Sequence, residues 1–247
     1  MKKLIILIIV FAGLGFAGWR VWQANKNDLQ LNSTNPKQSK PSPVVPSTSG
    51  FDKTKYSISE ANSLWRVVNK ARPLPDSYKP DDLVVPNVKL RLAKSVEQMH
   101  VSKKMQPDLE KMFIGAKVAG YDLMLASGFR SQAYQKQLYD SYVAKDGQVA
   151  ADRYSARPGT SEHQTGLAVD VGRIDQKCEL EICFGATEEG KWVAKNAAIY
   201  GFIIRYQDGK ESITTYQYEP WHLRYIGIEL AQELTKTDQT MEEFFNL

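Results

Sequence analysis

The part of the sequence after residue 50 has no excess of charge of either sign. The first 50 residues contain six basic residues and one acidic residue, whereas the remaining 197 residues contain 26 basic and 27 acidic residues. The formal net charge of +4 therefore comes from the N-terminal segment. A protein that binds nucleic acid through phosphate contacts needs positive charge in its folded part, so nucleic acid is excluded as the main partner.

Cysteine and histidine are scarce, with two and three residues among 247, so each can be considered individually. Hydrophobic residues make up 43% of the chain and charged residues 24%, which is typical of a globular protein and excludes a fibrous or wholly disordered chain. The sequence contains no internal repeat.

An apolar run of sixteen uncharged residues, 4–19, follows two lysines at the N-terminus. Positive residues before an apolar run are typical of a secretory signal, either cleaved or kept as an anchor. We therefore expect residues 1–22 to be a signal peptide or N-terminal membrane anchor, with the rest of the chain exported to the outer side of the membrane. The run has no cysteine near it, which excludes a lipid-modified N-terminus.

Residues 23–50 are rich in Ser, Pro, Asn, Thr and Lys and have few apolar side chains. Such a segment cannot bury enough apolar surface to offset the entropy lost on ordering, so we expect a disordered tether. One folded domain, residues 51–247, remains after it.

Apolar periodicity and turn residues predict the elements of this domain. We expect helices at 106–119, 131–145 and 187–198 and a short one from 240, and strands at 64–69, 121–127, 167–171, 202–206, 211–216 and 221–226. The dipeptide Asp208-Gly209 predicts a hairpin between the fourth and fifth of these strands. Helices come first and closely spaced strands come late, which favours a single α+β domain with a partly antiparallel sheet.

Three residues in the second half of the chain have the composition of a catalytic metal site. His163 and Asp170 are separated by six residues, and His222 follows 52 residues after Asp170. An ionised aspartate at the end of an apolar strand is costly unless a positive charge faces it, and a divalent metal supplies that charge. Two histidines and one carboxylate form the three-ligand set of a catalytic zinc, with the fourth position left for water. Spacing alone leaves this open, because a lone histidine is more often a hydrogen-bonded surface or core residue, the interpretation we give His100.

Glu219 strengthens the prediction, since a carboxylate beside a metal can accept a proton from the attacking water. Pro220 biases Glu219 towards an extended conformation, which can direct its carboxylate to the site. The alternative is a solvated glutamate at the start of a strand. Arg130 follows a predicted buried strand and can hold a substrate carboxylate or a developing oxyanion; its alternative is a salt bridge on a helix surface.

Three segments of the sequence carry a resemblance to a known family. They are SGFRS (127–131), ARPGTSEHQTGLAVD (156–170) and YEPWHLRY (218–225). The chain resembles the VanY-type D-alanyl-D-alanine carboxypeptidases, zinc peptidases that trim peptidoglycan stem peptides, from about residue 65 to residue 227. The resemblance implies a small α+β fold of the DD-peptidase and hedgehog-like type, with the zinc on an antiparallel sheet. It also implies one zinc per chain held by His163, Asp170 and His222, with Glu219 as the catalytic base.

By the same resemblance, four residues contact the peptide or its terminal carboxylate: Arg130, Gln135, Ser155 and Ser161. The function implied is hydrolysis of the C-terminal D-alanine from stem peptides, with a zinc-bound water as nucleophile and Glu219 as general base and acid. Alternatives are an L,D-carboxypeptidase acting on tetrapeptide stems, a cytoplasmic D,D-dipeptidase, a hedgehog-like signalling domain, and a non-catalytic zinc-stabilised module that binds the cell wall. We expect a monomer that contacts the membrane through its N-terminal segment.

Cys178 and Cys183 lie between the two predicted metal-binding segments, with four residues between them. In an exported domain an isolated pair of cysteines favours a disulfide that closes a short loop. Metal binding by the pair is the alternative.

Overall fold

The computed structural model describes residues 51–55, 57–76 and 78–247. The chain divides into two units, residues 1–49 and 50–247, and the described residues belong to the second. The expected signal or anchor (1–22) and the expected tether (23–50) lie outside the described residues. No helix of the described part has the length and apolar character that crossing a membrane requires.

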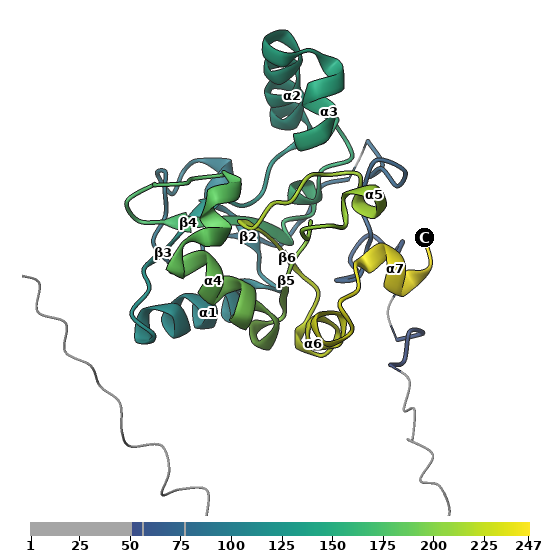
Figure 1. The fold of residues 1–247 in the computed structure, drawn as a ribbon. Helices are drawn as coiled ribbons and strands as arrows, with labels where there is room; N and C mark the ends of the chain where they lie inside the picture. Colours follow the sequence, from purple (N-terminus) through teal and green to yellow (C-terminus); the bar gives the residue numbers. More distant parts are fainter. Residues whose placement is uncertain (1–50, 56, 77) are drawn as a thin grey trace, which may run out of the picture. The chain divides into compact units, whose positions relative to one another are not determined.

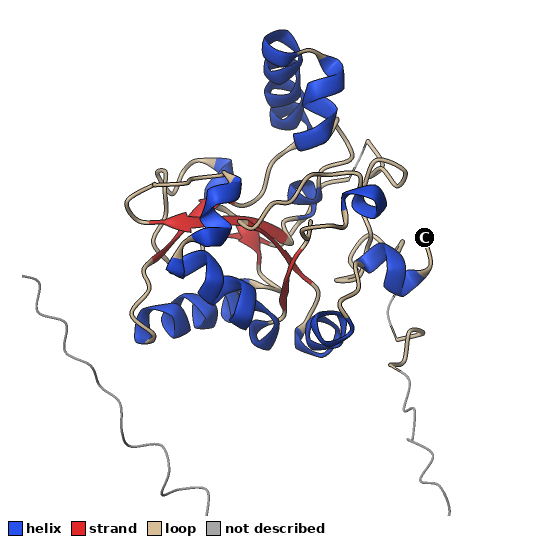
Figure 2. Cartoon of the chain, in the orientation of Figure 1, coloured by secondary structure: helices blue, strands red, loops and turns tan. Residues whose placement is uncertain are grey.

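A four-stranded antiparallel sheet lies at the centre of the domain (Figure 2). Its strands, in spatial order, are β3 (Leu123–Ser127), β4 (Ala168–Arg173), β6 (His222–Tyr225) and β5 (Phe202–Ile204). Each neighbouring pair is antiparallel. A separate two-stranded antiparallel sheet consists of β1 (Leu83–Val84) and β2 (Val101–Ser102). The predicted α+β fold with an antiparallel sheet is therefore confirmed.

Helices lie on both sides of this sheet (Figure 1). Below it in the view are α1 (Gln106–Val118) and α4 (Glu188–Asn196), and above it is the pair α2 (Gln132–Asp146) and α3 (Gln148–Tyr154). The other helices are α5 (Glu211–Thr214), α6 (Ile228–Thr237) and α7 (Met241–Phe245). The described residues also form four short 3-10 helices: η1 (Glu97–Met99), η2 (Glu162–Thr165), η3 (Ile182–Ala186) and η4 (Ala197–Tyr200).

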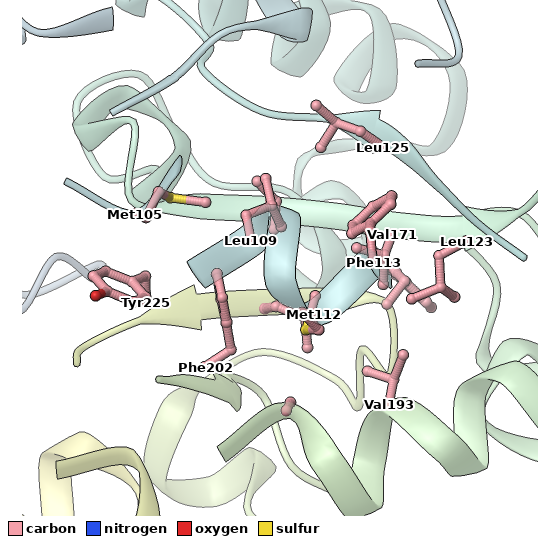
Figure 3. Close-up of a cluster of buried hydrophobic side chains, with 14 of the residues drawn as sticks. Met105, Leu109, Met112, Phe113, Leu123, Leu125, Val171, Val193, Phe202 and Tyr225 are labelled. Carbon is pink, nitrogen blue, oxygen red and sulfur yellow. The ribbon is translucent and has the colours of Figure 1, made fainter. Parts of the chain in front are cut away.

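The main core forms where α1 packs against the sheet (Figure 3). Leu109, Met112 and Phe113 on α1 are buried together with Leu125 of β3 and Val171 of β4. A second core cluster joins the N-terminal part of the domain to α6 and α7; it includes Trp65, Ile226, Leu230, Leu234, Met241 and Phe244. The main core thus packs against one face of the sheet that carries the predicted metal ligand Asp170 on β4.

Several predicted elements are confirmed to within a few residues. The helices expected at 106–119, 131–145 and 187–198 correspond to α1, α2 and α4, the last continued by η4. Ser131 caps α2, because its hydroxyl oxygen accepts a hydrogen bond from the backbone N–H of Tyr134. Thr240 and Glu243 form the predicted capping box of α7.

Two predicted strands are wrong. Residues 64–69 form no strand; the buried Trp65 packs instead in the second core cluster and its indole N–H donates to the carbonyl of Ile226. Residues 211–216 contain the helix α5, so the predicted hairpin is absent and β5 pairs with β6, with Ile204 opposite Leu223. Helices α3 and α6 were not predicted.

The packing of α1 on the sheet predicts a large loss of stability for Leu109→Ala. Leu109 is 0% exposed, and truncating such a side chain removes apolar contacts and leaves a cavity, so we expect a loss of about 2–5 kcal/mol in the free energy of unfolding. Urea denaturation followed by circular dichroism measures it. Lys111→Ala, on the exposed side of the same helix, is the control and should change the value by less than about 0.5 kcal/mol. Equal effects of the two substitutions would contradict this packing.

Candidate active site and metal centre

The pairing of β4 with β6 places Asp170 directly opposite His222. Residues that are directly opposite on neighbouring strands project from the same face of a sheet, so the two side chains meet. Oδ1 of Asp170 lies 3.1 Å from Nδ1 of His222. Both residues are buried, with 4% of their surface exposed. The strand register, rather than nearness in sequence, therefore brings together two residues that are 52 positions apart.

His163 reaches the same point from η2. This 3-10 helix ends at Thr165 and is capped by Gly166, whose φ of +69° is the left-handed conformation that favours glycine. Nε2 of His163 lies 3.3 Å from Oδ1 of Asp170. The other ring nitrogen, Nδ1, lies 2.6 Å from the carbonyl oxygen of Gly128. A carbonyl oxygen can only accept a hydrogen bond, so Nδ1 carries the proton and Nε2 is left free to act as a ligand.

The loop before α2 is held close to these elements by Gly128. A Cβ atom at this position would lie 2.3 Å from the carbonyl oxygen of His100, so only glycine permits this approach. The backbone N–H of Gly128 donates to the carbonyl of Gln98, and that of Arg130 donates to the carbonyl of His163. These backbone hydrogen bonds hold the carbonyl group that His163 contacts and the backbone of Arg130 beside the site.

The three side chains have the arrangement and chemistry of a zinc site. One potential ligand atom from each of His163, Asp170 and His222 lies within 4.8 Å of the other two. Nε2 of His163 is buried and makes no hydrogen bond within the described part of the chain. Two imidazoles and one carboxylate are the ligand set of catalytic zinc sites. These residues therefore fit a zinc ion.

The pKa shifts in the site follow from burial and from the close contacts of these groups. Burial lowers the pKa of His163 to about 4, so this imidazole is neutral at pH 7, as a metal ligand must be. Burial would raise the pKa of Asp170, but the adjacent imidazoles of His163 and His222 outweigh it and hold the pKa well below its usual value. Burial would lower the pKa of His222, but contacts with Asp170 and Glu162 outweigh it and raise the pKa to about 9.

Glu219 lies beside this cluster, in a turn that leads into β6. The turn is closed by the backbone N–H of His222, which donates to the carbonyl of Glu219, at 3.1 Å. Oε2 of Glu219 lies 3.8 Å from Nδ1 of His222. Burial raises the pKa of Glu219 to about 7, so its carboxyl group can both accept and donate a proton near neutral pH. A cation bound at the three ligands would oppose this shift, because positive charge favours the carboxylate.

Arg130 lies inside the site. Its Nη2 atom is 3.9 Å from Oδ2 of Asp170, and its Nε atom is buried without a hydrogen-bond partner among the described residues. A guanidinium with unused donors can bind a carboxylate or an oxyanion. The salt bridge on a helix surface that we considered as the alternative for Arg130 is not found in the described part of the chain.

One cavity contains all of the predicted site residues. Its walls include Glu219, the three potential metal ligands, and the four residues expected to contact substrate: Arg130, Gln135, Ser155 and Ser161. Nε2 of Gln135 donates to the carbonyl of Ala156, at 2.8 Å, while its Oε1 atom is buried and unpaired within the described residues. His100 does not line this cavity; its ring contacts the carbonyl of Val96.

A family model described as "VanY: D-alanyl-D-alanine carboxypeptidase" matches residues 98–228, the segment that holds the predicted metal ligands and Glu219. The chain belongs to the VanY family. The YodJ protein of Bacillus subtilis (strain 168) is 44% identical over 188 residues, which are 76% of this chain and 69% of YodJ.

The chain is also similar to two solved structures of carboxypeptidases. The LD-carboxypeptidase LdcB is 44% identical with a TM-score of 0.70, over 74% of this chain and 86% of LdcB. A mutant of the vancomycin-resistance D,D-pentapeptidase VanY, from a VanB-type cassette and in complex with Zn(II), is 32% identical with a TM-score of 0.60. That similarity covers 75% of this chain and 99% of that VanY.

Aromatic residues that sequence reasoning missed form much of the cavity wall in this VanY-family chain. They are Tyr142, Tyr154, Tyr206, Tyr216 and Trp221. Tyr206 stacks on the ring of His222, with ring centroids 5.0 Å apart. Tyr142 lies seven residues after Gln135 on α2, so the helical period places both on one face of the helix. The helical period therefore indicates from the sequence that Tyr142 lies in the site. Tyr206 follows β5, and it reaches the site through the pairing of β5 with β6, which the sequence does not indicate.

The predicted disulfide between Cys178 and Cys183 is confirmed, and the alternative of metal binding by this pair is wrong. The short loop that it closes contains Leu180, which also lines the cavity. The disulfide therefore restrains a part of the wall of the site.

The geometry predicts that His163→Ala and His222→Ala each abolish tight zinc binding, because each removes one of three ligands. Zinc content after dialysis against a weak chelator, measured by atomic emission, tests this. His100→Ala is the matched control and should retain one zinc per chain, since His100 lies outside the cavity. Equal zinc content in wild type and in the His163 and His222 variants would refute the ligand assignment.

Proposed function

We propose that this VanY-family chain is a zinc-dependent carboxypeptidase that hydrolyses the C-terminal D-alanine from peptidoglycan stem peptides, in the first place at a D-alanyl-D-alanine bond. The observation that carries the proposal is the convergence of His163, Asp170 and His222 in one cavity with the buried carboxyl group of Glu219 beside them. Family membership supports the reaction class.

In this proposal His163, Asp170 and His222 would hold one zinc ion. When bound, the zinc supplies positive charge that polarises the scissile carbonyl and makes water a better nucleophile. Glu219 accepts the proton of the attacking water and later donates it to the amine of the departing D-alanine. Burial raises the pKa of Glu219, which favours acceptance of the proton, while the positive charge of a bound zinc would oppose this shift and favour the carboxylate.

Substrate binding is assigned to the side chains that surround the catalytic group. Arg130 holds the terminal carboxylate of the peptide or the oxyanion that develops at the scissile carbonyl, since its guanidinium stays charged and has unused donors. Gln135, Ser155 and Ser161 supply polar contacts to the peptide from the same cavity. The unpaired Oε1 atom of Gln135 supports this role, because a buried acceptor without a partner is costly unless a ligand satisfies it.

Glu219 also favours an enzyme over a non-catalytic module that binds the cell wall. A module with a structural zinc has no use for a buried carboxyl group that lies 3.8 Å from a ligand and is not needed in the ligand set. Burial raises the pKa of this carboxyl group, and carboxyl groups perturbed in this way are common at catalytic sites.

An L,D-carboxypeptidase acting on tetrapeptide stems is the second candidate. The specific observation in its favour is the similarity to the LD-carboxypeptidase LdcB, which at 44% identity and a TM-score of 0.70 exceeds the similarity to the D,D-pentapeptidase VanY. The catalytic groups proposed above serve either reaction, because the two substrates differ only in the residue that precedes the scissile bond.

We also propose that the domain works in the cell-wall space, held at the outer face of the cytoplasmic membrane by residues 1–22 and the tether 23–50. The sequence pattern supports this, with lysines before an apolar run and a polar segment after it. A stem peptide is found outside the membrane, which suits an exported enzyme.

Glu219→Gln is expected to lower kcat by about 10⁴-fold or more with little change in KM, since acid–base catalysis typically contributes 10²–10⁴-fold and one residue serves both proton transfers here. The substitution keeps the side-chain volume and leaves the three ligands intact. Steady-state release of D-alanine at matched zinc occupancy measures the effect. Glu229→Gln, an exposed carboxylate on α6, is the control and should keep wild-type kcat. Rates for Glu219→Gln within about threefold of wild type would show that Glu219 is not the base.

Synthetic stem peptides test the proposed substrate. The full chain is incubated with a pentapeptide that ends in D-alanyl-D-alanine and with the tetrapeptide that lacks the last residue, and D-alanine is followed by mass spectrometry. A D,D-carboxypeptidase should release D-alanine faster from the pentapeptide. Release of D-alanine from the tetrapeptide alone would favour the L,D-carboxypeptidase. Binding of both peptides without hydrolysis would establish the wall-binding module instead.

A further inference from the structure

Glu162 lies next to His163 in η2 and is 1% exposed. Its Oε1 atom accepts two hydrogen bonds, one from Nε of Arg205 at 2.8 Å and one from Nη1 of Arg224 at 2.9 Å. Both guanidinium groups are completely buried. The two arginines therefore fix one oxygen of this carboxylate behind the candidate zinc site.

The second oxygen of Glu162 faces His222. Oε2 lies 3.6 Å from Nε2 of His222, and neither atom has a hydrogen-bond partner among the described residues. The other nitrogen of the same ring, Nδ1, lies 3.1 Å from Oδ1 of Asp170. The imidazole thus has one nitrogen directed at the potential ligands and the other directed at a buried carboxylate that has spare acceptor capacity.

A neutral imidazole carries one proton, and the nitrogen that binds a metal must be the one without it. We propose that Glu162 is a positioning residue that keeps the proton of His222 on Nε2 and so leaves Nδ1 free for the zinc. This inference rests on the proposed zinc site. Gly128 has the corresponding role for His163, where a carbonyl oxygen accepts from Nδ1 and leaves Nε2 free. Partners of this kind orient metal-binding histidines and increase their affinity for the metal.

The position of Glu162 is itself held by the rest of the fold. Arg205 also donates to both carboxylate oxygens of Glu242 on α7, at 2.6 and 2.9 Å. Nη2 of Arg224 donates to the carbonyls of Leu64 and Arg66. Because Oε1 is held by both arginines, the carboxylate cannot turn away from His222 without losing these bonds.

Glu162→Gln tests the proposal, with zinc affinity as the readout. The amide oxygen of glutamine can still accept from the arginines, which directs its NH₂ group at Nε2 of His222. That group donates to Nε2 and favours the proton on Nδ1, where it competes with the metal. We expect zinc affinity, measured in the full chain by competition with a chromophoric chelator, to fall about 10–100-fold.

Glu242→Gln is the matched control. It removes a carboxylate from the same buried Arg205 but does not touch His222, so a general loosening of the charge network should weaken zinc binding in both variants. The proposal predicts that Glu242→Gln changes zinc affinity by less than about threefold while Glu162→Gln loses 10–100-fold. Equal loss in both variants, or unchanged affinity in Glu162→Gln, would overturn it.

A measurement on the wild-type chain makes the test independent of how the variants fold. The chain has only three histidines, so ¹⁵N-histidine labelling gives three imidazole signals in long-range ¹H–¹⁵N spectra. In the zinc-loaded protein we expect His222 to carry its proton on Nε2; a proton on Nδ1 would overturn the proposal. If the wild type binds zinc and hydrolyses the peptide, and Glu162→Gln keeps the same affinity for zinc, only the role of Glu162 is refuted. Absence of zinc binding in wild type would refute the proposed function together with it.

Discussion

The buried carboxylate of Asp170 is the feature on which the arrangement of the site depends. It lies on a strand in the interior of the sheet, and a charge in such a place must be balanced. On one side of His222 this balance would come from a metal held with His163. On the other side, the equally buried carboxylate of Glu162 is balanced by Arg205 and Arg224. Arg205 and Arg224 thus lie behind His222, and the front of the site, where Arg130 lies 3.9 Å from Asp170, is left for a cation and substrate.

The sequence predicted several of the elements that depend on residues close together in the chain, and it failed where an element depends on long-range contacts. The stripe on α1 and the Ser131 cap of α2 are local signals, and both helices are where the sequence predicts them. The turn signal Asp208-Gly209 suggested a hairpin with a strand at 211–216, but β5 pairs with β6, with Ile204 opposite Leu223. Leu64, Trp65 and Val67 in the segment 64–69 pack in the second core cluster and do not belong to a sheet. Helix α6 is also determined locally, because Leu230 and Leu234 lie about one helical turn apart and are both buried.

The centre of the site was predictable and its surroundings were not. The rare histidines and their spacing with Asp170 suggested a metal site but left it open, and the resemblance to the VanY-type family implied the three ligands and Glu219 as the base. The aromatic wall and the balancing arginines come from elements that are brought together only by tertiary structure. Glu162 shows this most clearly, because its neighbours Arg205 and Arg224 follow 43 and 62 residues later. No spacing in the sequence indicates that their side chains surround one carboxylate.

The most direct test of this account is anomalous diffraction at the zinc absorption edge from crystals of the zinc-loaded chain. The account predicts one strong peak per chain, about 2.0–2.2 Å from Nε2 of His163, a carboxylate oxygen of Asp170 and Nδ1 of His222. Glu219 should lie near the peak without being a ligand. A peak at His100, or a zinc bound without Asp170, would contradict it.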